Sequence, residues 1–357
     1  MTGSVVAETV DLPAVERWMD SAGLGAGPLT DVSFMAGGTQ NVLVALSRSG
    51  RSYVLRRPPL HKRANSDETM RREARVLAGL AGSDVPHPRL VAACDDVSVI
   101  GAVFYLMESV AGVNPTVTLP ACLAGPAGQR ATGFAVADAL AAIGRVDIDA
   151  TGLASLGRAS RPGTPDGWLE RQVGRWTGQL ESYAQFPGWS RDGLPDTAAL
   201  RDWLTANQPP AWTPGLIHGD YHLANVMLKA DEPGVAAVVD WELATAGDPL
   251  VDLGQLLATW CEDDGSAAAS TILALPGFPS RAELVARYAA GSARDLSRIG
   301  WYRVLACYRL GVLLEGTNAR AAAAQADPDL GLRMRQRAAD LFEQGLRVMS
   351  GPTGSGE

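Results

Sequence analysis

The spacing of apolar residues changes near residue 110, and this change restricts the chain to an α+β fold with two parts. Before it, short β-rich runs alternate with turns; after it, apolar residues recur at helical spacing. Strands followed by a run of helices predict a small β-rich lobe, residues 1–110, and a larger helical lobe, residues 111–350, with a flexible tail at 351–357. The elements expected in the first lobe are a helix at 13–22, strands at 32–35, 41–46 and 52–56, a helix at 66–81, and strands at 90–94 and 103–108.

The second lobe is predicted to be helical except for one β-hairpin. The hairpin comprises a strand at 226–228, a turn at 231–234 and a strand at 235–241. The segment LIHGDYHLANVML, residues 216–228, leads into it and places several polar residues just before the first hairpin strand. Helical spacing is found at 131–143, 165–183, 197–205, 251–259, 281–291, 297–315 and 330–348.

Charge and hydropathy exclude several classes of protein. A formal net charge of −8 argues against a general nucleic-acid binder, which would carry a basic surface. No run reaches the ~18 apolar residues of a membrane helix. The first residues lack the basic and apolar regions of a signal peptide, so a cytoplasmic location is expected. The four cysteines are widely separated, which favours buried reduced thiols over a zinc site or disulfides.

Three polar residues around the hairpin have the chemistry of a catalytic site. Asp220 can accept a hydrogen bond from a substrate hydroxyl and orient it, while Asn225 can bind a hard cation through its amide oxygen. Asp240, at the end of the second hairpin strand, would supply a second cation ligand from the same cleft. The alternative is that Asp220 and Asp240 are turn residues at the ends of the hairpin, where Asp is common.

The motifs HGDYHLAN and VVDWELATAGDPLVDL resemble those of the aminoglycoside phosphotransferase and choline kinase superfamily, which has a protein-kinase-like fold. His218, Gly219 and Asp220 align with the H-R-D of protein kinases, and Asn225 aligns with the Asn of the same pattern. Asp240 aligns with the Asp of D-F-G. The resemblance implies a bilobal kinase that uses ATP and Mg²⁺, with Asp220 as the catalytic residue and with Asn225 and Asp240 as metal ligands.

The resemblance also places the ATP site in the first lobe, below a hinge near 107–111. The glycine pair of AGGTQN would let backbone amides approach the phosphates, although a Gly-Gly hairpin turn also explains this segment. Met107 resembles the gatekeeper before the hinge, and the backbone beyond it would contact adenine. The residues implied in ATP binding are Arg56, Glu73, Gly38, Thr39, Gln40, Asn41, Met107, Glu108 and Val110.

Arg56 departs from the family pattern, because kinases carry a lysine at this position of the strand YVLRRPP. The only lysines, Lys62 and Lys229, lie elsewhere. A guanidinium can hold two phosphate oxygens in a fork, so the replacement is chemically sound. By strand alternation Arg57 faces the other side of the sheet. Glu73 is the expected partner of Arg56, the alternative being a solvated surface ion pair with neighbouring arginines.

Four further residues are expected to support the catalytic loop. His218 would hold the loop by hydrogen bonds, and Asp252 would support it from the following helix. His222 lies where protein kinases carry a phosphate-contacting lysine, although packing on the loop is an equal explanation. Glu242, two residues after Asp240 on an extended strand, would point the same way and bind a second metal ion or a water.

Within the superfamily, the chain resembles most the kinase-like domains fused to acyl-CoA dehydrogenases in animals and their stand-alone bacterial relatives. The shared phrases include YVLRRPP, WLERQVGRWTGQ and YRVLACYRLGVLLEGTNAR. The resemblance implies phosphorylation of hydroxyacyl-CoA thioesters, notably 4-hydroxyacyl-CoAs, a functional link to an acyl-CoA dehydrogenase, and a monomer or homodimer. Gly144 departs from this branch, which has a histidine there.

The acceptor is expected to bind in the second lobe, near cations and aromatic rings. The expected pocket residues are Trp176, Arg175, Trp301, Tyr302 and Arg309. Exposed helix charges and core aromatic residues are the alternative explanation for this set. Two other functions stay open: an antibiotic kinase acting on an aminoglycoside or macrolide, and a non-catalytic pseudokinase that binds nucleotide.

Overall fold

The N-terminal part is built on a five-stranded antiparallel sheet with the strand order β1-β2-β3-β5-β4. The computed structural model describes residues 10–35, 41–62, 64–116, 120–157, 167–260, 273 and 275–351. The expectations for Gly38, Thr39 and Gln40, and for the tail beyond residue 351, lie outside these residues. The strands are β1 (Thr30–Phe34), β2 (Val42–Arg48), β3 (Arg51–Arg57), β4 (Leu90–Cys94) and β5 (Phe104–Glu108).

Both faces of the sheet are covered, each by one helix. Helix α2 (Leu12–Ser21) packs through Val15 and Met19 on the face that carries Leu55 and Phe104. Helix α3 (Ser66–Gly79) covers the face that carries Tyr105. Because side chains alternate along a strand, the two faces of the central strand β3 carry different residues.

Arg56 and Arg57 point to opposite faces of the sheet. Arg56 pairs across the strands with Tyr105 and therefore faces α3. Arg57 faces the α2 side, where its guanidinium donates hydrogen bonds to the carbonyls of Pro58 and Ile100. This is the arrangement expected from strand alternation, and it leaves Arg56 as the cation that faces the second part of the chain.

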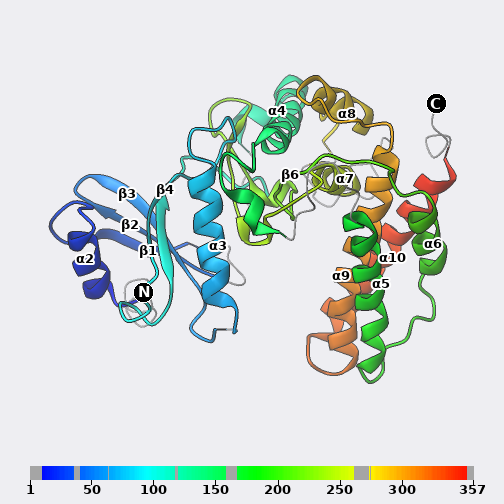
Figure 1. Ribbon diagram of the computed structural model, residues 1–357, viewed down its shortest axis with the longest axis horizontal. Coiled ribbons are helices and arrows are strands. Elements are labelled where there is room, and N and C mark those ends of the chain that lie inside the picture. The colour runs from blue at the N-terminus through cyan, green and yellow to red at the C-terminus, as the bar shows by residue number, and fades with distance from the viewer. Residues whose placement is uncertain are drawn as a thin grey trace.

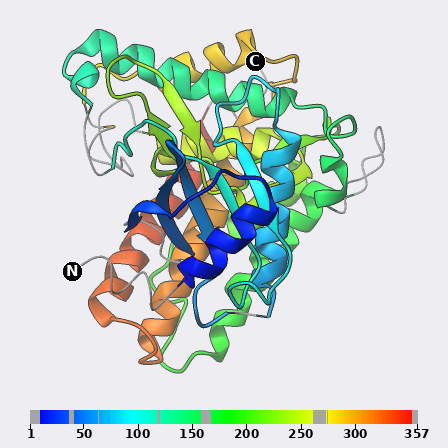
Figure 2. The same ribbon diagram turned by 90° about the vertical axis from the view of Figure 1, so that its left-hand side faces the viewer.

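The C-terminal part is mainly helical, as expected from the sequence, and α3 lies between it and the sheet (Figure 1). Figure 2 shows the strands and α2 in front of the C-terminal helices. None of the described helices is both long and apolar enough to cross a membrane. The helices are α4 (Pro126–Arg145), α5 (Trp168–Ser182), α6 (Thr197–Ala206), α7 (Leu250–Thr259), α8 (Arg281–Ala290), α9 (Ile299–Ala322) and α10 (Pro328–Ser350).

Two short antiparallel pairs of strands interrupt these helices. The predicted hairpin consists of β7 (Val226–Leu228) and β8 (Val235–Val238). A second pair, β6 (Gly215–Ile217) with β9 (Thr245–Gly247), encloses the hairpin and was not predicted. The loop between β6 and β7 therefore has a paired strand at each end.

Three elements differ clearly in length from their predictions. Helix α4 begins at Pro126, five residues before the predicted start at 131. Strand β8 ends at Val238 rather than at 241, because Asp240 adopts a left-handed backbone conformation with φ 66° and the next three residues form a 3₁₀ turn. Helix α9 continues to Ala322 instead of ending at 315. The alanines at its end have the highest helix propensity, which accounts for the extension.

A single large hydrophobic core continues across the boundary between the two parts. It contains Met70 and Leu77 from α3 and Tyr105 from the sheet, together with the interior faces of the C-terminal helices. The segment after β5 is also attached to the second part: Val113 and Leu228 exchange two backbone hydrogen bonds of 2.8 Å. These contacts bring Arg56 close to the loops of the second part.

Candidate active site

The loop that contains Asp220 connects β6 to β7 and is anchored at both ends by buried apolar residues. Ile217 before the loop and Val226 after it are both buried in the large core. Gly219 has φ 87°, a left-handed conformation that favours glycine, and a Cβ there would overlap the carbonyl oxygen of Leu243. The apolar anchors and this glycine fix the path of the polar residues between them.

Asp252, in the first turn of α7, supports this loop from below. Its carboxylate accepts hydrogen bonds from the backbone N–H groups of His218, at 2.6 Å, and Gly219, at 3.0 Å. Burial raises the pKa of Asp252 to about 7, while these two hydrogen bonds favour the ionised form. Asp248, just before the helix, is also buried and accepts a hydrogen bond from the Leu250 N–H and another from the Tyr302 hydroxyl.

His218 connects the loop to the residue before Asp240. Its Nδ1 accepts a hydrogen bond from the backbone N–H of Asp220, at 3.2 Å, and its Nε2 lies 3.0 Å from the carbonyl oxygen of Val239. This pairing requires the neutral ring with its proton on Nε2. Burial lowers the pKa of His218 to about 4, consistent with a neutral scaffold residue rather than a proton donor.

The carboxylate of Asp220 has partners on both oxygens. Oδ1 accepts a hydrogen bond of 2.7 Å from Nε2 of Gln255, and Oδ2 lies 3.2 Å from His222 Nε2 and 3.2 Å from Asn225 Nδ2. Burial alone would raise the pKa of Asp220, but hydrogen bonds from His222 and Gln255 and the charge of Arg309 outweigh it. The net pKa lies well below the usual value, so Asp220 is ionised at neutral pH.

Asn225 and Asp240 lie on neighbouring segments tied to each other. The Asn225 amide nitrogen donates to the carbonyl oxygen of Asp220, at 2.9 Å, so its amide oxygen points away from that contact. Among the described residues no group donates to this oxygen. The backbone carbonyl of Asn225 accepts a 2.9 Å hydrogen bond from Val239 N–H, directly before Asp240. The two predicted metal ligands therefore sit side by side.

Arg56 and Glu73 form a buried ion pair that extends into the second part of the chain. Arg56 Nε donates to Glu73 Oε2 at 2.9 Å, and its Nη2 donates to Asp240 Oδ1 at 2.7 Å. Arg56 is 7% exposed and Glu73 is 1% exposed, so Glu73 is not a solvated surface partner. Burial and the nearby carboxylates raise the pKa of Glu73 to about 7, although Arg56 opposes this.

Glu242 completes a group of three carboxylates around one guanidinium. It lies in a 3₁₀ turn rather than on the expected extended strand, and its Oε2 is still 3.8 Å from Arg56 Nη2. Asn41 donates to the same carboxylate at 3.1 Å. Burial and the neighbouring charge of Asp240 raise the pKa of Glu242. This excess of negative charge over positive charge favours a bound cation.

The donor set fits Mg²⁺, which takes hard oxygen ligands and keeps several waters. Asn225 Oδ1 and the Asp240 carboxylate would hold the ion, and phosphate oxygens and water would complete its coordination. In the described part of the chain, no three His, Cys, Asp or Glu side chains are arranged to hold a metal by themselves. The half-exposed side chain of Asp240 is accessible to such an ion.

The segment expected to contact adenine lies at the end of β5. Met107 is partly buried against the large core, and Glu108 is exposed. The Glu108 N–H already donates to the carbonyl of Arg89 at 2.9 Å, so it cannot serve a nucleotide base. A contact here would instead use the carbonyl of Glu108 or the backbone of Val110.

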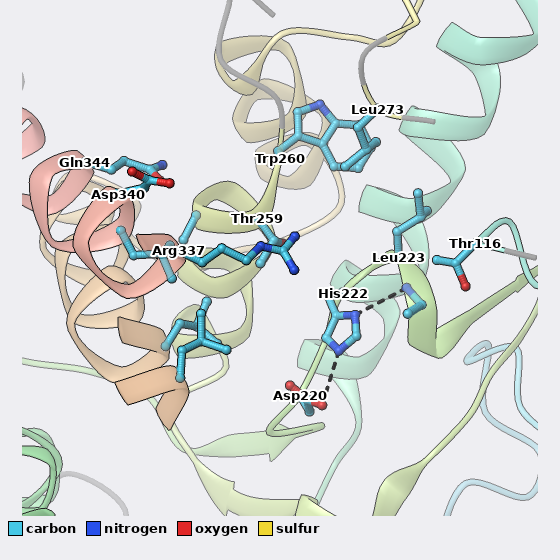
Figure 3. A pocket seen from close by; sticks show the side chains of 15 residues that line it. Thr116, Asp220, His222, Leu223, Thr259, Trp260, Leu273, Arg337, Asp340 and Gln344 are labelled. Carbon is cyan, nitrogen blue, oxygen red and sulfur yellow. Dashed lines mark hydrogen bonds and ion pairs between the residues drawn. The ribbon is translucent and has the colours of Figure 1, made fainter. Parts of the chain in front are cut away.

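A cavity of about 370 Å³ opens beside Asp220 and His222 (Figure 3). Figure 3 shows Arg337 extending from α10 across the cavity toward Thr259 and His222. Most of the wall is apolar, with residues from α7, α9 and α10. The apolar members are Leu223, Ala224, Ala258, Trp260, Leu273, Leu310, Leu314 and Leu341, and the polar ones besides the catalytic loop are Thr116, Thr259, Arg337, Asp340 and Gln344.

None of the five residues expected to form the acceptor pocket lines this cavity. Trp301 and Tyr302 are buried in the core and donate to the Leu204 carbonyl and to Asp248. Trp176 is buried beneath the guanidinium groups of Arg175 and Arg309, at 4.8 and 5.5 Å from its ring. Arg175 and Trp176 belong to α5, which does not line the cavity, and the expected residues of α9 lie on other positions of that helix than Leu310 and Leu314, which do line it. Their role in binding an acceptor stays a prediction.

The cavity residues of α10 carried a signal that sequence reasoning missed. Arg337, Asp340, Leu341 and Gln344 follow the i, i+3, i+4, i+7 pattern of one helix face. Two charged residues and an amide inside such a stripe mark it as something other than a plain core face. Gly144, where the resembling branch has a histidine, lies elsewhere: its carbonyl accepts a hydrogen bond from Arg294, and a Cβ there would approach the Tyr288 hydroxyl at 3.0 Å.

A small antiparallel sheet above a helical region, with a polar loop and a left-handed aspartate at their junction, defines a protein-kinase-like architecture. Residues 31–301 match the model of the phosphotransferase enzyme family known as APH, and the chain belongs to that family.

Similar proteins support this assignment. A Ralstonia eutropha crystal structure, described as a candidate aminoglycoside phosphotransferase, is 31% identical, with a TM-score of 0.79, over 95% of this chain and 98% of that chain. The APH(4)-Ia aminoglycoside phosphotransferase in complex with ADP and hygromycin B shares the fold, at 16% identity and a TM-score of 0.60, over 95% of this chain and 99% of its own. Acyl-CoA dehydrogenase family member 11 of Gallus gallus is 29% identical over 90% of this chain and 41% of its own length. The chain thus spans less than half of the curated relatives it matches.

Proposed function

We propose that the protein is a kinase that uses ATP and Mg²⁺ to phosphorylate an alcohol hydroxyl. One observation carries this proposal: an ionised Asp220 stands at the wall of a cavity and is linked through Asn225 and Asp240 to the buried Arg56. A proton acceptor for a hydroxyl and a cation for phosphate thus occupy adjoining spaces. Phosphoryl transfer needs positioning and charge neutralisation at such a junction.

Each residue has one task in this proposal. Asp220 accepts the proton of the acceptor hydroxyl and orients its oxygen toward the γ-phosphorus. Arg56 binds phosphate oxygens through its planar fork, and Glu73 holds it in place. Asn225 and Asp240 would bind Mg²⁺, which neutralises phosphate charge when bound. His218 keeps the loop in register with Asp240.

We further propose that the acceptor is a hydroxyacyl-CoA of the 4-hydroxyacyl type. An apolar cavity wall suits an acyl chain, and the guanidinium of Arg337 suits a carbonyl or an anionic group of the ester. The match to a protein named as an acyl-CoA dehydrogenase family member points to the same substrate class. Such a kinase would convert a hydroxide, a poor leaving group, into a phosphate ester that a following elimination can expel.

Phosphorylation of an aminoglycoside is the second candidate, favoured by the similarity to the Ralstonia eutropha structure. The two candidates are separated by incubating the protein with ATP, Mg²⁺ and either hydroxyacyl-CoAs of increasing chain length or a panel of aminoglycosides and macrolides. Acceptor-dependent ADP release and the mass of the phosphorylated product identify the substrate. Turnover with antibiotics alone would overturn the hydroxyacyl-CoA assignment, and nucleotide binding without any turnover would indicate a pseudokinase.

The catalytic role of Asp220 is tested by Asp220→Asn, which keeps the shape of the side chain and removes its charge. We expect phosphoryl transfer to fall by ~10²-fold or more, the scale of general-base catalysis, with nucleotide affinity near the wild-type value. Calorimetric titration with a non-hydrolysable ATP analogue measures that affinity. Asp231→Asn, an exposed change in the turn between β7 and β8, is the control. Full activity of Asp220→Asn would refute the proposed mechanism.

A further inference from the structure

Gln255 makes the shortest side-chain contact to Asp220, and no motif of the sequence pointed to it. The residue lies in α7, three positions after Asp252, and is completely buried. Its Nε2 donates to Asp220 Oδ1 at 2.7 Å, compared with 3.2 Å for each contact to Oδ2. A buried amide at this distance restricts the rotation of the carboxylate.

The orientation of the Gln255 amide is set by Arg309. Arg309 Nη1 donates to Gln255 Oε1 at 2.5 Å, and its Nη2 donates to the carbonyl oxygen of Gly219. A guanidinium has only donors, so the amide oxygen must face it and the amide nitrogen must face Asp220. The same guanidinium lies over the ring of Trp176, which limits its own movement. Arg309, Gln255 and Asp220 therefore form one directed chain of hydrogen bonds.

The hydrogen bonds from Arg309 through Gln255 give the two carboxylate oxygens of Asp220 different surroundings. Gln255 and Arg309 are buried, and neither lines the cavity beside Asp220. Oδ1 is thus engaged inside the protein. Oδ2 is the oxygen that meets His222, which does line the cavity (Figure 3). An acceptor hydroxyl in the cavity would therefore encounter Oδ2.

We propose that Gln255, held by Arg309, is a positioning residue that assigns proton acceptance to Oδ2 of Asp220. This inference rests on the proposed kinase function. In the step concerned, the acceptor O–H proton passes to Oδ2, and the acceptor oxygen forms a bond to the γ-phosphorus. The bond from the γ-phosphorus to the bridging oxygen breaks, and ADP leaves with that electron pair. Without Gln255, the carboxylate rotates and presents its oxygens to the hydroxyl in an unproductive geometry.

The kinetic test compares two substitutions of Gln255. Gln255→Met keeps the length of the side chain and removes the donor, and Gln255→Glu keeps an acceptor for Arg309 but also removes the donor. We expect both to lower kcat by about 10- to 100-fold, the scale of a misplaced reacting group, with the KM for ATP within about twofold of wild type. Gln129→Met removes another buried glutamine, which bonds to the Leu123 carbonyl, and should leave kcat unchanged.

A combined variant separates positioning from a general structural effect. In an Asp220→Asn background, Gln255→Met should cause almost no further loss of the residual activity, because residues that act as a unit are not additive. A purely structural role would lower the residual activity by the same factor as in the wild type. That outcome, or a Gln255→Met enzyme with wild-type kcat, would overturn the proposal.

A crystal structure of Gln255→Met tests the inference independently of the acceptor. We expect one conformer of the Asp220 carboxylate in the wild-type protein and two or more in the variant. A single, unchanged conformer in the variant would overturn the positioning role. If the wild-type protein phosphorylates no acceptor, the proposed function fails while this structural comparison still decides whether Gln255 orients Asp220.

Discussion

Asp240 has an uncommon left-handed backbone conformation, and its carboxylate binds Arg56, the guanidinium that Glu73 and Glu242 also approach. A left-handed conformation is costly for most side chains, but Asp tolerates it better than β-branched or bulky residues. Here it ends β8 and turns the carboxylate toward Arg56. An extended residue at this position would continue the strand and direct the carboxylate elsewhere. The conformation is therefore part of how the site is assembled.

Arg56 is expected to contribute to nucleotide binding. Arg56→Ala should raise the KM for ATP by about tenfold or more, because charged hydrogen bonds contribute roughly 1.5–3 kcal/mol. Steady-state kinetics with varied ATP measures this change. Arg51→Ala, an exposed substitution on the same strand β3, is the control. An unchanged KM in Arg56→Ala would remove Arg56 from the nucleotide site.

His218 should make the free energy of unfolding depend on pH. Its pKa is about 4 in the folded protein and 6.5 in an ordinary environment, so only the unfolded chain takes up this proton between those values. The contribution of His218 to stability is therefore complete above pH 6.5 and is lost as the pH falls toward 4. From pH 7 to pH 5 this loss amounts to about 2 kcal/mol.

Urea denaturation at the two pH values measures the effect. The wild-type protein should lose about 2 kcal/mol more between pH 7 and pH 5 than His218→Gln, which cannot titrate. His61→Gln replaces an exposed histidine and should keep the wild-type pH dependence. Equal pH dependence in wild type and His218→Gln would show that His218 is not held in its neutral form.

At the scale of elements, helix α7 provides Asp252 and Gln255, which form hydrogen bonds to the catalytic loop, and it packs closely against α9. A Cβ at Gly254 would overlap the backbone carbonyl of Tyr302 in α9, and a backbone atom cannot rotate away. The two helices can therefore approach each other only with glycine at this position. Asp252 and Gln255, on either side of Gly254, depend on the same approach for their distance from the loop.

Gly254→Ala should lower both stability and activity. Overpacking of this kind costs typically 1–3 kcal/mol, and the shift of α7 should reduce kcat more than it changes the KM for ATP. Thermal unfolding and steady-state kinetics measure the two effects. Gly178→Ala in α5 is the matched control, because no atom lies within 4 Å of its Cβ position. That variant should instead gain about 0.5–1 kcal/mol from the higher helix propensity of alanine. A stable, fully active Gly254→Ala protein would contradict the close packing of α7 and α9.

Most helices and strands could be predicted from the sequence, because the spacing of apolar residues that marks them lies within each element. The five strands and the helices of both parts were found, with the largest differences in length at α4 and α9, and the motifs that contain Asp220, Asn225 and Asp240 were recognisable at fixed spacing. Strands β6 and β9 were missed because three residues carry almost no periodic signal. Gln255 was missed for a different reason: its importance comes from contacts with Asp220 and Arg309, which are distant in sequence, and no spacing within α7 reveals these contacts.

At the scale of the whole molecule, the shared core makes the two parts thermodynamically dependent. Leu77 and Tyr105 from the first part belong to the same buried cluster as the C-terminal helices. Unfolding of the first part alone would therefore expose apolar side chains of the second part to water. We expect the folded chain to behave as one cooperative unit even though its architecture has two lobes.

Calorimetry of Met19→Ala tests this cooperativity. Met19 is fully buried in the separate cluster between α2 and the sheet, on the opposite face of the sheet from Tyr105 and the shared core. Removing it should destabilise by about 2–5 kcal/mol and should shift one unfolding transition of the whole chain to lower temperature. Exposed Met35→Ala is the control. A second, smaller transition that alone responds to Met19→Ala would show that the lobes unfold independently.

The backbone bridge between Val113 and Leu228 has a consequence for how the cleft can open. The segment leaving the sheet is attached to the strand that directly follows Asn225. A hinge in the segment before this bridge would let Arg56 move with the sheet, breaking its contact with Asp240, while Asp220, Asn225 and Asp240 keep their mutual distances. We therefore expect the acceptor side of the cleft to be preassembled, and the phosphate side to be assembled anew each time the molecule closes on a nucleotide.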